Sequence, residues 1–401
     1  MEAPLTLYSV ILLLGAAHGV FLAIVLINVK TGNVVALRLL AFLTLVFAVD
    51  LSVNFVMVSG YILHFPRLIY VESVGMFLYG PLLYFYVRTL TSREQWHFSA
   101  RQWMHLLPFV MSVALLVPYF SLSNETLVEI INENATAEEF LGNWALGAQI
   151  VAISPRLLIG IYLALAIRRL AQHGRNIRDQ FSLIEHISLN WLRNLLIAIG
   201  LIYVLYLVAL VFGGKGPVEN LLNIAIVIVV YTLGYMGLRQ PVIFTQRELG
   251  QLGQLGQLES GDARRVVGDK SDSAEVPKYQ RSALDDNSSK LLLEELQEIM
   301  ATSRPYLDST LALSQLADQL NISSNYLSQV INQQTGSNFF DYINGHRVQA
   351  AKEILADPAQ SRSNVLTIAM DSGFNSKSAF YSAFRQHAHM TPIQYRQSKE
   401  S

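Results

Sequence analysis

Roughly the first 240 residues alternate between long apolar stretches and short polar connections. Each stretch has about the ~20 residues that an α-helix needs to cross the hydrocarbon core of a bilayer at 1.5 Å per residue. The stretches cover residues 5–28, 36–62, 68–87, 103–120, 146–167, 190–213 and 218–238. The pattern predicts seven transmembrane helices.

The pattern changes after residue 244. Residues 245–287 contain the run GQLGQLGQL and are then rich in Asp, Ser, Gly and Lys. Frequent glycine opposes a helix, and the segment lacks the apolar residues that a core needs. We expect a flexible linker, whose ~40 residues have a root-mean-square span of about 35 Å. Such a linker favours signalling through the positioning or association of the parts it joins, rather than through a rigid push.

The remaining residues, 288–401, have the pattern of short amphipathic helices. Residues 313–320 are helical, a brief turn follows, and Ser323 is suited to cap a second helix. The same arrangement recurs over residues 365–388, where Ser376 is the expected cap. A longer helix is expected between the two. Two short helices joined by a tight turn form a helix-turn-helix, so this part is predicted to contain two such motifs.

These motifs resemble the DNA-binding domain of the AraC/XylS family of transcription regulators. The resemblance covers roughly residues 290–397, over LSQLADQLNISSNYLSQVINQQTGSNFFDYINGHRVQAAKEIL and IAMDSGFNSKSAFYSAFRQHAHMTPIQYR. The pattern in the second half comprises IA, GF, Phe380, Phe384, Thr391-Pro392 and Tyr395-Arg396. The family has glycine two residues before Thr-Pro, where this chain has His389, and a left-handed backbone there costs a non-glycine residue roughly 1 kcal/mol.

The membrane part resembles, more weakly, the membrane halves of tethered AraC-type regulators. The expected fold is therefore all-α, a polytopic seven-helix transmembrane bundle followed by a soluble all-α double helix-turn-helix domain. The expected domains are a sensor (1–244), a flexible cytoplasmic linker (245–287) and a DNA-binding domain (288–401).

Helix periodicity indicates which side chains of the two second helices face outward. Inward positions are Leu327, Val330 and Ile331 in the first helix, and Ala379, Phe380, Ala383 and Phe384 in the other. The outward positions are Asn325, Ser328, Gln329, Asn332, Lys377, Ser378, Tyr381, Ser382 and Arg385. The resemblance implies base and phosphate contacts at these positions. The alternative is a face that is merely solvated.

The two faces differ in their chemistry. Asn and Gln side chains can pair bidentately with adenine in the major groove, whereas Lys377 and Arg385 suit guanine or phosphate. The first helix has no cation, so we expect it to contribute more to sequence specificity than to electrostatic attraction of DNA. The connecting helix, with some 18 residues, is about 27 Å long. This is close to the ~34 Å turn of B-DNA, so one chain can place both motifs in successive major grooves.

Loop charge predicts the orientation of the spans, because Lys and Arg near span ends are retained in the cytoplasm. Twelve basic residues lie on one set of alternate connections and two on the other. The twelve are Lys30, Arg38, Arg88, Arg93, Arg101, Arg168, Arg169, Arg175, Arg178, Arg193, Arg239 and Arg247, and the two are Arg67 and Lys215. The N-terminus is therefore expected outside an inner membrane, with the C-terminal domain in the cytoplasm. Seven buried helices of a soluble core would not produce this asymmetry.

Four polar residues within the spans are candidates for function, because ionisable groups are costly in the bilayer. They are Asp50, Asn54, Glu72 and Arg156. Asn54 lies one helical turn from Asp50 and thus on the same face. One interpretation is an outward-opening polar pocket in which Arg156 binds an anionic ligand or pairs with Asp50. The other is a structural ion pair that fixes helix packing.

The composition removes several kinds of chemistry. The 401 residues are 52% hydrophobic and 15% charged, with a formal net charge of -1 and no cysteine. The sequence has no thiolate, no HExxH metal motif, no GxSxG nucleophile and no Lys in the seventh span for a retinal Schiff base. We therefore predict no catalytic residue, no metal site and no cofactor, and the chain is not expected to be an enzyme.

The sequence predicts a membrane-bound, sequence-specific transcription regulator that couples a signal sensed by the membrane domain to promoter binding. The expected partners are double-stranded promoter DNA, the lipid bilayer and a small-molecule or extracytoplasmic signal of unknown identity. A second copy of the chain, in a homodimer, and RNA polymerase are further candidates. The alternative is a membrane transporter or channel whose C-terminal cytoplasmic module is a protein-interaction or regulatory domain.

Overall fold

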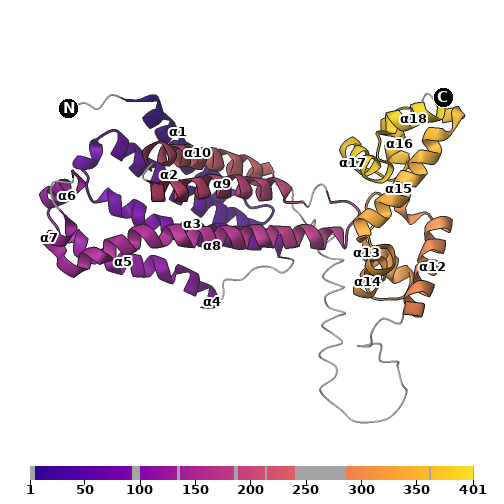
Figure 1. Ribbon diagram of the computed structural model, residues 1–401, viewed down its shortest axis with the longest axis horizontal. Coiled ribbons are helices and arrows are strands. Elements are labelled where there is room, and N and C mark those ends of the chain that lie inside the picture. Colours follow the sequence, from indigo (N-terminus) through magenta and orange to yellow (C-terminus); the bar gives the residue numbers. More distant parts are fainter. Residues whose placement is uncertain are drawn as a thin grey trace, which may run out of the picture. The chain divides into compact units, whose positions relative to one another are not determined.

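The computed structural model describes residues 5–92, 100–132, 136–184, 188–212, 215–239, 286–360 and 363–400. These residues form helices joined by short connections, and their one isolated strand-like pairing joins Phe181 and Ala312 (Figure 1). The all-α prediction is confirmed. The predicted linker lies outside the described residues, except for Asp286 and Asn287, which already belong to the first helix of the next domain.

Contacts divide the chain into two compact units. The N-terminal unit comprises Met1–His173 and Leu189–Val242, and the C-terminal unit comprises Gly174–Ser188 and Ile243–Ser401. The assignment of residues 174–188 to the C-terminal unit was not anticipated from the sequence.

Seven helices of the described residues are long and apolar enough to cross a membrane, as the apolar pattern predicted. They are formed by α1 (Leu7–Asn28), α2 (Val34–Val58), α3 (Leu68–Thr91), α4 (Ala100–Trp103) with η2 (Met104–Leu106) and α5 (Leu107–Phe120), α8 (Ala145–Arg178), α9 (Asn190–Phe212) and α10 (Lys215–Arg239). Short helices lie in the connections, namely η1 (Tyr61–Leu63), α6 (Asn124–Ile131), α7 (Ala137–Leu141) and η3 (Gly142–Trp144).

The helix α8 is longer than its apolar stretch. The sequence predicts a span over 146–167, whereas α8 continues to Arg178. The added residues are mostly polar. Arg, Leu, Ala and Gln among them are good helix formers, so the helix continues beyond the apolar stretch. Arg175 and Arg178 lie in the last turn, where positive charge interacts favourably with the helix dipole.

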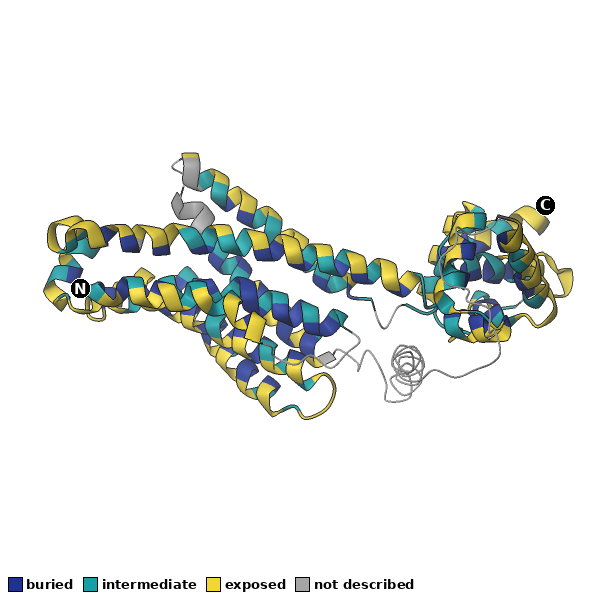
Figure 2. Cartoon of the chain, turned by 90° about the horizontal axis from the view of Figure 1, so that it is seen from below, coloured by how far each residue is buried: buried dark blue, intermediate teal, exposed yellow. Residues whose placement is uncertain are grey.

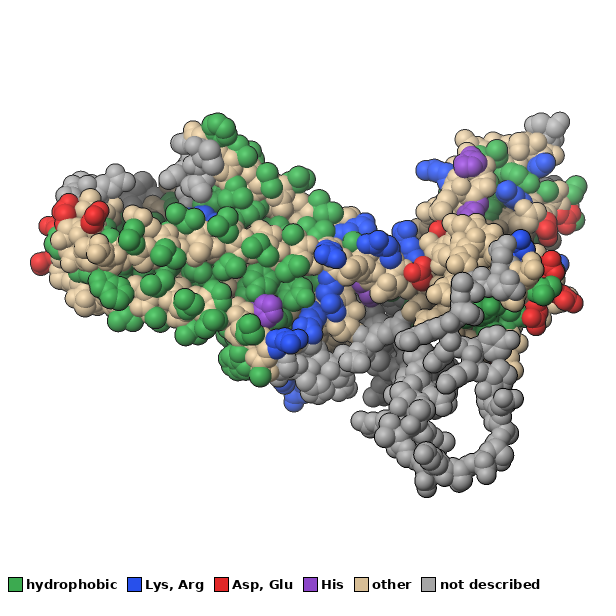
Figure 3. Space-filling view, turned by 60° about the horizontal axis from the view of Figure 1, so that its bottom comes forward, with side chains coloured by type: hydrophobic (Ala, Val, Ile, Leu, Met, Phe, Trp, Pro, Cys, Tyr) green, Lys and Arg blue, Asp and Glu red, His purple; other side chains and the backbone are tan. Residues whose placement is uncertain are grey.

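Large apolar side chains cover the outside of the N-terminal unit. Phe21, Leu157 and Leu201 have exposed fractions of 62%, 62% and 69%. Figure 2 shows exposed positions along the outer faces of these helices, and Figure 3 shows hydrophobic side chains over the middle of the unit. In Figure 3 acidic side chains gather at one end and basic side chains at the other. Apolar surface of this extent is typical of contact with lipid or another protein.

Inside the N-terminal unit, α2 packs against α1, α3 and α10. Leu12, Ala16, Leu51 and Val227 form one buried cluster between α1, α2 and α10. A second cluster joins α3, α5 and α8 and includes Phe77, together with Leu116 and Val151 among others. Asp50 lies buried on α2 within this interior.

The C-terminal unit contains the two predicted helix-turn-helix motifs. Its helices are α12 (Asp286–Thr302), η4 (Pro305–Leu307), α13 (Leu313–Gln319), α14 (Ser324–Thr335), α15 (Phe339–Ala356), η5 (Pro358–Gln360), α16 (Val365–Asp371), α17 (Lys377–Ala388) and α18 (Pro392–Glu400). Figure 1 shows α15 as the long element between the two motifs.

Each motif has its own hydrophobic core, and α15 contributes to both. Phe339 and Ile343 of α15 pack into the core that contains α12, α13 and α14. Val348, Ala351 and Leu355 pack into the core of α16 and α17. The connecting helix α15 is therefore part of both hydrophobic cores, and it fixes the separation of the two motifs.

Candidate nucleic-acid interface and membrane pocket

The first helix-turn-helix is closed by local hydrogen bonds. The turn after α13 contains Asn321 with φ 57°, and the Ile322 amide donates to the Ala317 carbonyl at 3.0 Å. The Ser323 hydroxyl then accepts from the Tyr326 amide at 3.3 Å and begins α14. Gly336, with φ 68°, ends the helix. The predicted cap and breaker are confirmed, and they set where α14 begins and ends.

The helix α14 buries one face and exposes the other. Leu327, Val330 and Ile331 are fully buried, in agreement with the predicted inward face. On the opposite face, Asn325, Gln329 and Asn332 are exposed, and Ser328 is half-buried. The side-chain amide of Asn332 donates from Nδ2 to the Ser328 carbonyl at 2.9 Å, so this side chain is held against its own helix.

The second motif repeats this arrangement, and its exposed face also carries positively charged side chains. Ser376 caps α17 by accepting from the Ala379 amide at 3.1 Å, and Phe380 and Phe384 are buried. Exposed along α17 are Lys377, Ser378, Ser382 and Arg385, and Tyr381 is half-buried. The Lys377 ammonium lies 5.5 Å from the centre of the Tyr381 ring. Both cations of the candidate reading faces therefore lie on α17.

His389 ends α17 in the left-handed region, with φ 57°. Its amide donates to the Arg385 carbonyl at 3.0 Å and closes the last turn. The position is the one at which the family has glycine, so the sequence-based expectation of a left-handed backbone there is confirmed. His389 adopts the left-handed backbone conformation that glycine would adopt there, at the conformational cost that a residue with a Cβ atom has in this region.

The two motifs meet at Arg347 and Gly373. Arg347 of α15 is buried, and its Nε donates to the Tyr306 carbonyl at 2.7 Å while Nη2 donates to the Asp308 carbonyl at 2.8 Å. Burial lowers the pKa of Arg347 to about 10, and Asp308 opposes this shift, so the guanidinium stays charged at neutral pH. Gly373 approaches the same Tyr306 carbonyl from the second motif. Sequence reasoning did not single out Arg347, because a buried helical arginine has no local signature.

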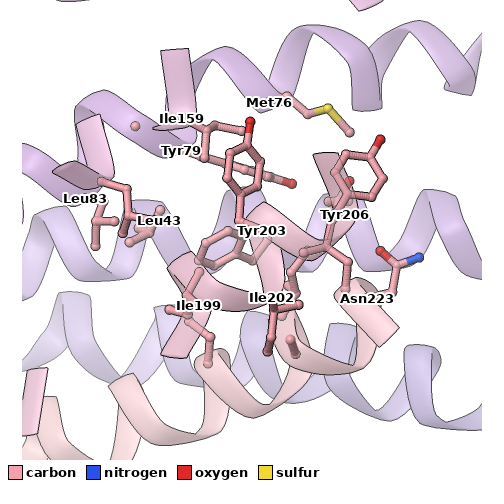
Figure 4. A pocket seen from close by; sticks show the side chains of 18 of the residues that line it. Leu43, Met76, Tyr79, Leu83, Ile159, Ile199, Ile202, Tyr203, Tyr206 and Asn223 are labelled. Carbon is pink, nitrogen blue, oxygen red and sulfur yellow. The ribbon is translucent and has the colours of Figure 1, made fainter. Parts of the chain in front are cut away.

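The four polar residues predicted within the spans line one cavity of about 140 Å³ in the N-terminal unit. Figure 4 shows the labelled side chains of this cavity, among them Tyr79, Tyr203 and Tyr206. Apolar side chains such as Leu43, Leu83 and Ile199 line much of the remaining wall. A second cavity of about 340 Å³ shares Asn54, Glu72, Met76, Arg156 and Asn223 with the first.

Two sets of hydrogen bonds connect these polar groups across helices. Asn223 of α10 donates to Tyr8 of α1 and to Asn54 of α2, both at 3.0 Å. Arg156 of α8 donates from Nε to the Tyr206 hydroxyl of α9 at 2.8 Å. Sequence reasoning missed Tyr8, Asn223 and Tyr206. An amide inside an apolar span was a signal that could have identified Asn223.

The described residues contain no group of three or more His, Asp or Glu side chains placed to hold a metal ion. The polar part of the lining combines the guanidinium of Arg156 with the carboxyl groups of Asp50 and Glu72 and with hydroxyls and amides, and apolar side chains form the rest of the wall.

The chain is similar to known proteins that contain a helix-turn-helix domain. Residues 316–398 match a family model described as a helix-turn-helix domain. The Melibiose operon regulatory protein of Escherichia coli (strain K12) is 30% identical over 89 residues, which are 22% of this chain and 28% of that protein. An uncharacterized HTH-type transcriptional regulator of Staphylococcus aureus (strain COL) is 31% identical over 86 residues, which are 21% of this chain and 11% of that protein.

The chain thus spans about a quarter of the length of the curated relatives that it matches first. Among solved structures, the C-terminal domain of the two-component response regulator yesN from Fusobacterium nucleatum is 31% identical over 28% of this chain and 99% of that chain, with a TM-score of 0.23. So low a score adds nothing to the description of the fold.

Proposed function

Since residues 316–398 match a family model described as a helix-turn-helix domain and the two motifs resemble those of the AraC/XylS family, we propose that the chain is a membrane-bound, sequence-specific transcription regulator. The observation that carries the proposal is the pair of polar outward faces on α14 and α17, on the same chain as seven membrane-length helices. In this proposal the N-terminal unit senses a signal, and the C-terminal unit binds promoter DNA at the membrane surface.

The reading residues divide into two roles. Asn325, Ser328, Gln329 and Asn332 of α14 contact base edges, because their amides and hydroxyls can donate and accept in the major groove. Lys377 and Arg385 of α17 hold phosphate or guanine, with Ser378, Tyr381 and Ser382 beside them. The absence of any cation among the α14 candidates leaves most of the electrostatic attraction to α17.

Two substitutions separate these roles. Gln329→Ala removes about 1 to 3 kcal/mol of binding to the preferred sequence and relaxes base preference, because a bidentate base contact is lost. Arg385→Ala weakens binding to all DNA more evenly and lowers the salt dependence. Glu353→Ala, at an exposed position of α15, is the matched control and leaves both unchanged. Equal losses on specific and random DNA for Gln329→Ala would refute its assigned role.

The test of the whole proposal is genome-wide mapping of DNA that cross-links to the intact chain in living cells. We expect recovery of a small set of promoter fragments that share a sequence, and salt-dependent binding of the purified chain to them. Cross-linking no stronger than that of an unrelated membrane protein would contradict the proposal.

Membrane insertion with the N-terminus outside is part of the same proposal. Two features support this orientation. Large apolar side chains are exposed on the outside of the N-terminal unit, and acidic and basic side chains gather at opposite ends of it in Figure 3. Reporter fusions should place the loop 121–145 outside and residue 260 inside. Reports of both positions on one side of the membrane would overturn the topology.

The cavity lined by Asp50, Asn54, Glu72 and Arg156 is the proposed sensing site, and an anionic amphipathic molecule is its proposed ligand. Arg156→Gln should abolish the response to the signal and leave promoter binding intact. Native mass spectrometry should show a co-purifying anion on the wild-type chain and not on Arg156→Gln. If Asp50→Asn restored the response of Arg156→Gln, the pair would instead be a structural ion pair.

A further inference from the structure

A short segment of the C-terminal unit comes from far away in the sequence. Residues 179–184, directly after α8, pair with the stretch that precedes α13. The Ser182 amide donates to the Leu311 carbonyl at 3.2 Å, and the Leu313 amide donates to the Gln180 carbonyl at 3.0 Å. The two bonds flank Phe181 and Ala312, which makes them a non-hydrogen-bonded antiparallel pair.

Side-chain bonds reinforce this backbone pairing. Ser182 is buried, and its hydroxyl donates to the Leu311 carbonyl at 2.6 Å. The same hydroxyl accepts from Nη2 of Arg347 at 3.1 Å, and the Ser182 carbonyl lies 3.4 Å from Nη1. Arg347, the residue that joins the two motifs, therefore also holds the incoming segment.

The charge of Arg347 explains why the segment has a defined place. A guanidinium has five N–H donors, and a buried charged donor that lacks an acceptor destabilises the fold. Tyr306 and Asp308 supply two carbonyl acceptors from within the DNA-binding domain, and Ser182 supplies two further oxygens. Removal of the segment would leave two of these bonds without their partner.

The docked segment leaves the candidate reading faces free. It contacts Leu311, Leu313 and Arg347, none of which belongs to the outward faces of α14 and α17. With the segment in place, Gln329 and Arg385 are exposed. Docking and DNA contact are thus compatible on the same domain.

We propose that residues 179–184 are an intramolecular docking segment that clasps the DNA-binding domain through the strand pairing at Ala312 and the guanidinium of Arg347. The domain is then held at two places in the sequence, by this clasp and by the chain that enters α12. The segment follows α8, the helix that also carries Arg156, so a change at the sensing cavity reaches the domain through the clasp rather than through residues 245–287. This regulatory role rests on the proposed function. The contact between residues 179–184 and the domain does not depend on it.

The absence of cysteine from the chain allows a direct test in the full-length protein in nanodiscs. The Phe181→Cys/Ala312→Cys pair occupies facing positions whose Cα atoms are typically about 4.5 Å apart, within the range that a disulfide spans. Mild oxidation should produce a disulfide within one chain. Phe181→Cys/Lys399→Cys is the control, because Lys399 lies on α18, whose Tyr395 packs against the core of the second motif. Equal cross-linking in both pairs, none in the first, or cross-linked dimers alone would overturn the proposal.

Hydrogen exchange provides a second readout that needs no cysteine. Ser182→Pro removes the amide that donates to Leu311 and lies outside the helix-turn-helix motifs, so the domain stays folded. We expect the Leu313 amide to exchange at least about tenfold faster in this variant, with α14 and α17 unchanged. Ser182→Ala, which removes the hydroxyl bonds alone, should give a smaller change. Unchanged exchange at Leu313 in Ser182→Pro would refute the clasp.

The regulatory role is tested with a promoter fragment recovered by cross-linking of the wild-type chain. The oxidised Phe181→Cys/Ala312→Cys protein in nanodiscs should bind this fragment as the reduced protein does. In cells, where cytoplasmic thiols stay reduced, Ser182→Pro is used instead to release the clasp, and its promoter output should no longer follow the signal. A promoter output that followed the signal in Ser182→Pro as in the wild type would refute the regulatory role. Loss of binding on oxidation would show that the clasp inhibits DNA binding and would refute a binding-competent docked state. If no wild-type fragment were recovered, the proposed function would fail while the two preceding tests kept their meaning.

Discussion

Substitution of Gly373 tests how closely the two helix-turn-helix motifs approach each other. Gly373 follows α16 with φ 85°, and a Cβ atom placed there would lie 2.4 Å from the Tyr306 carbonyl oxygen. It would also lie 2.9 Å from Cα and 3.0 Å from the carbonyl oxygen of Leu307. All three atoms are backbone, so no side-chain rotation can relieve the contact.

The free energy of unfolding should fall for two reasons in Gly373→Ala. A left-handed backbone costs a residue with Cβ about 1 to 2 kcal/mol. Overpacking against fixed neighbours costs about 1 to 3 kcal/mol more. Gly336→Ala is the matched control, because Gly336 has φ 68° and no atom within 4 Å of its added Cβ. The control isolates the backbone cost, and the difference between the variants measures the close approach.

Hydrogen exchange of the full-length chain in nanodiscs measures both effects element by element. Relative to the wild type, exchange of α16 and α17 in Gly373→Ala should be accelerated roughly 5- to 150-fold more than exchange of α14 in Gly336→Ala, which corresponds to about 1 to 3 kcal/mol. Equal exchange in the two variants would show that the contact with Tyr306 and Leu307 does not hold the motifs together.

Three further changes have defined outcomes. His389→Gly should raise the unfolding free energy of the second motif by up to about 1 kcal/mol, since the left-handed φ of 57° no longer carries a penalty; thermal or exchange measurements showing a loss would contradict this. Insertion of one to ten Gly and Ser residues after Gly256 should leave signal response intact, because flexible length changes effective concentration slowly, whereas a promoter output that oscillates with the helical period would show an ordered helix. Burial lowers the pKa of His346 and His387, so below about pH 6.5 the unfolded chain binds more protons and stability is lost as pH falls. His387→Asn should reduce the loss in protection between pH 7.5 and 5, and an unchanged pH dependence in this variant would contradict that assignment.

The features that the sequence determined by itself are local. Seven helices of membrane-spanning length followed from the lengths of apolar runs. The boundaries of α14 and α17 followed from Ser323 and Ser376, whose hydroxyls accept from amides three residues away. The left-handed backbone of His389 followed from the resemblance to the AraC/XylS family, which has glycine at that position. For the two caps, the deciding interaction spans less than about one helical turn.

The outward faces of α14 and α17 followed from periodicity for the same reason. Once Leu327, Val330 and Phe380 are buried, the 3.6-residue repeat leaves the polar positions on the other side. Periodicity places those side chains at the surface, and their role toward DNA remains a prediction that the substitutions of Gln329 and Arg385 test.

The tertiary structure decided which distant residues meet. Ser182 and Leu311 are 129 positions apart, and Asn54 and Asn223 are 169 apart. No pattern of hydrophobic and polar residues encodes such pairs, because hydrogen bonding of one buried polar group depends on where folding brings another. Arg347 shows this most clearly, since it is an ordinary helical arginine in the sequence. Only the packed domain surrounds its guanidinium with the oxygens of Tyr306, Asp308 and Ser182, because a buried charge must find its acceptors wherever the fold supplies them.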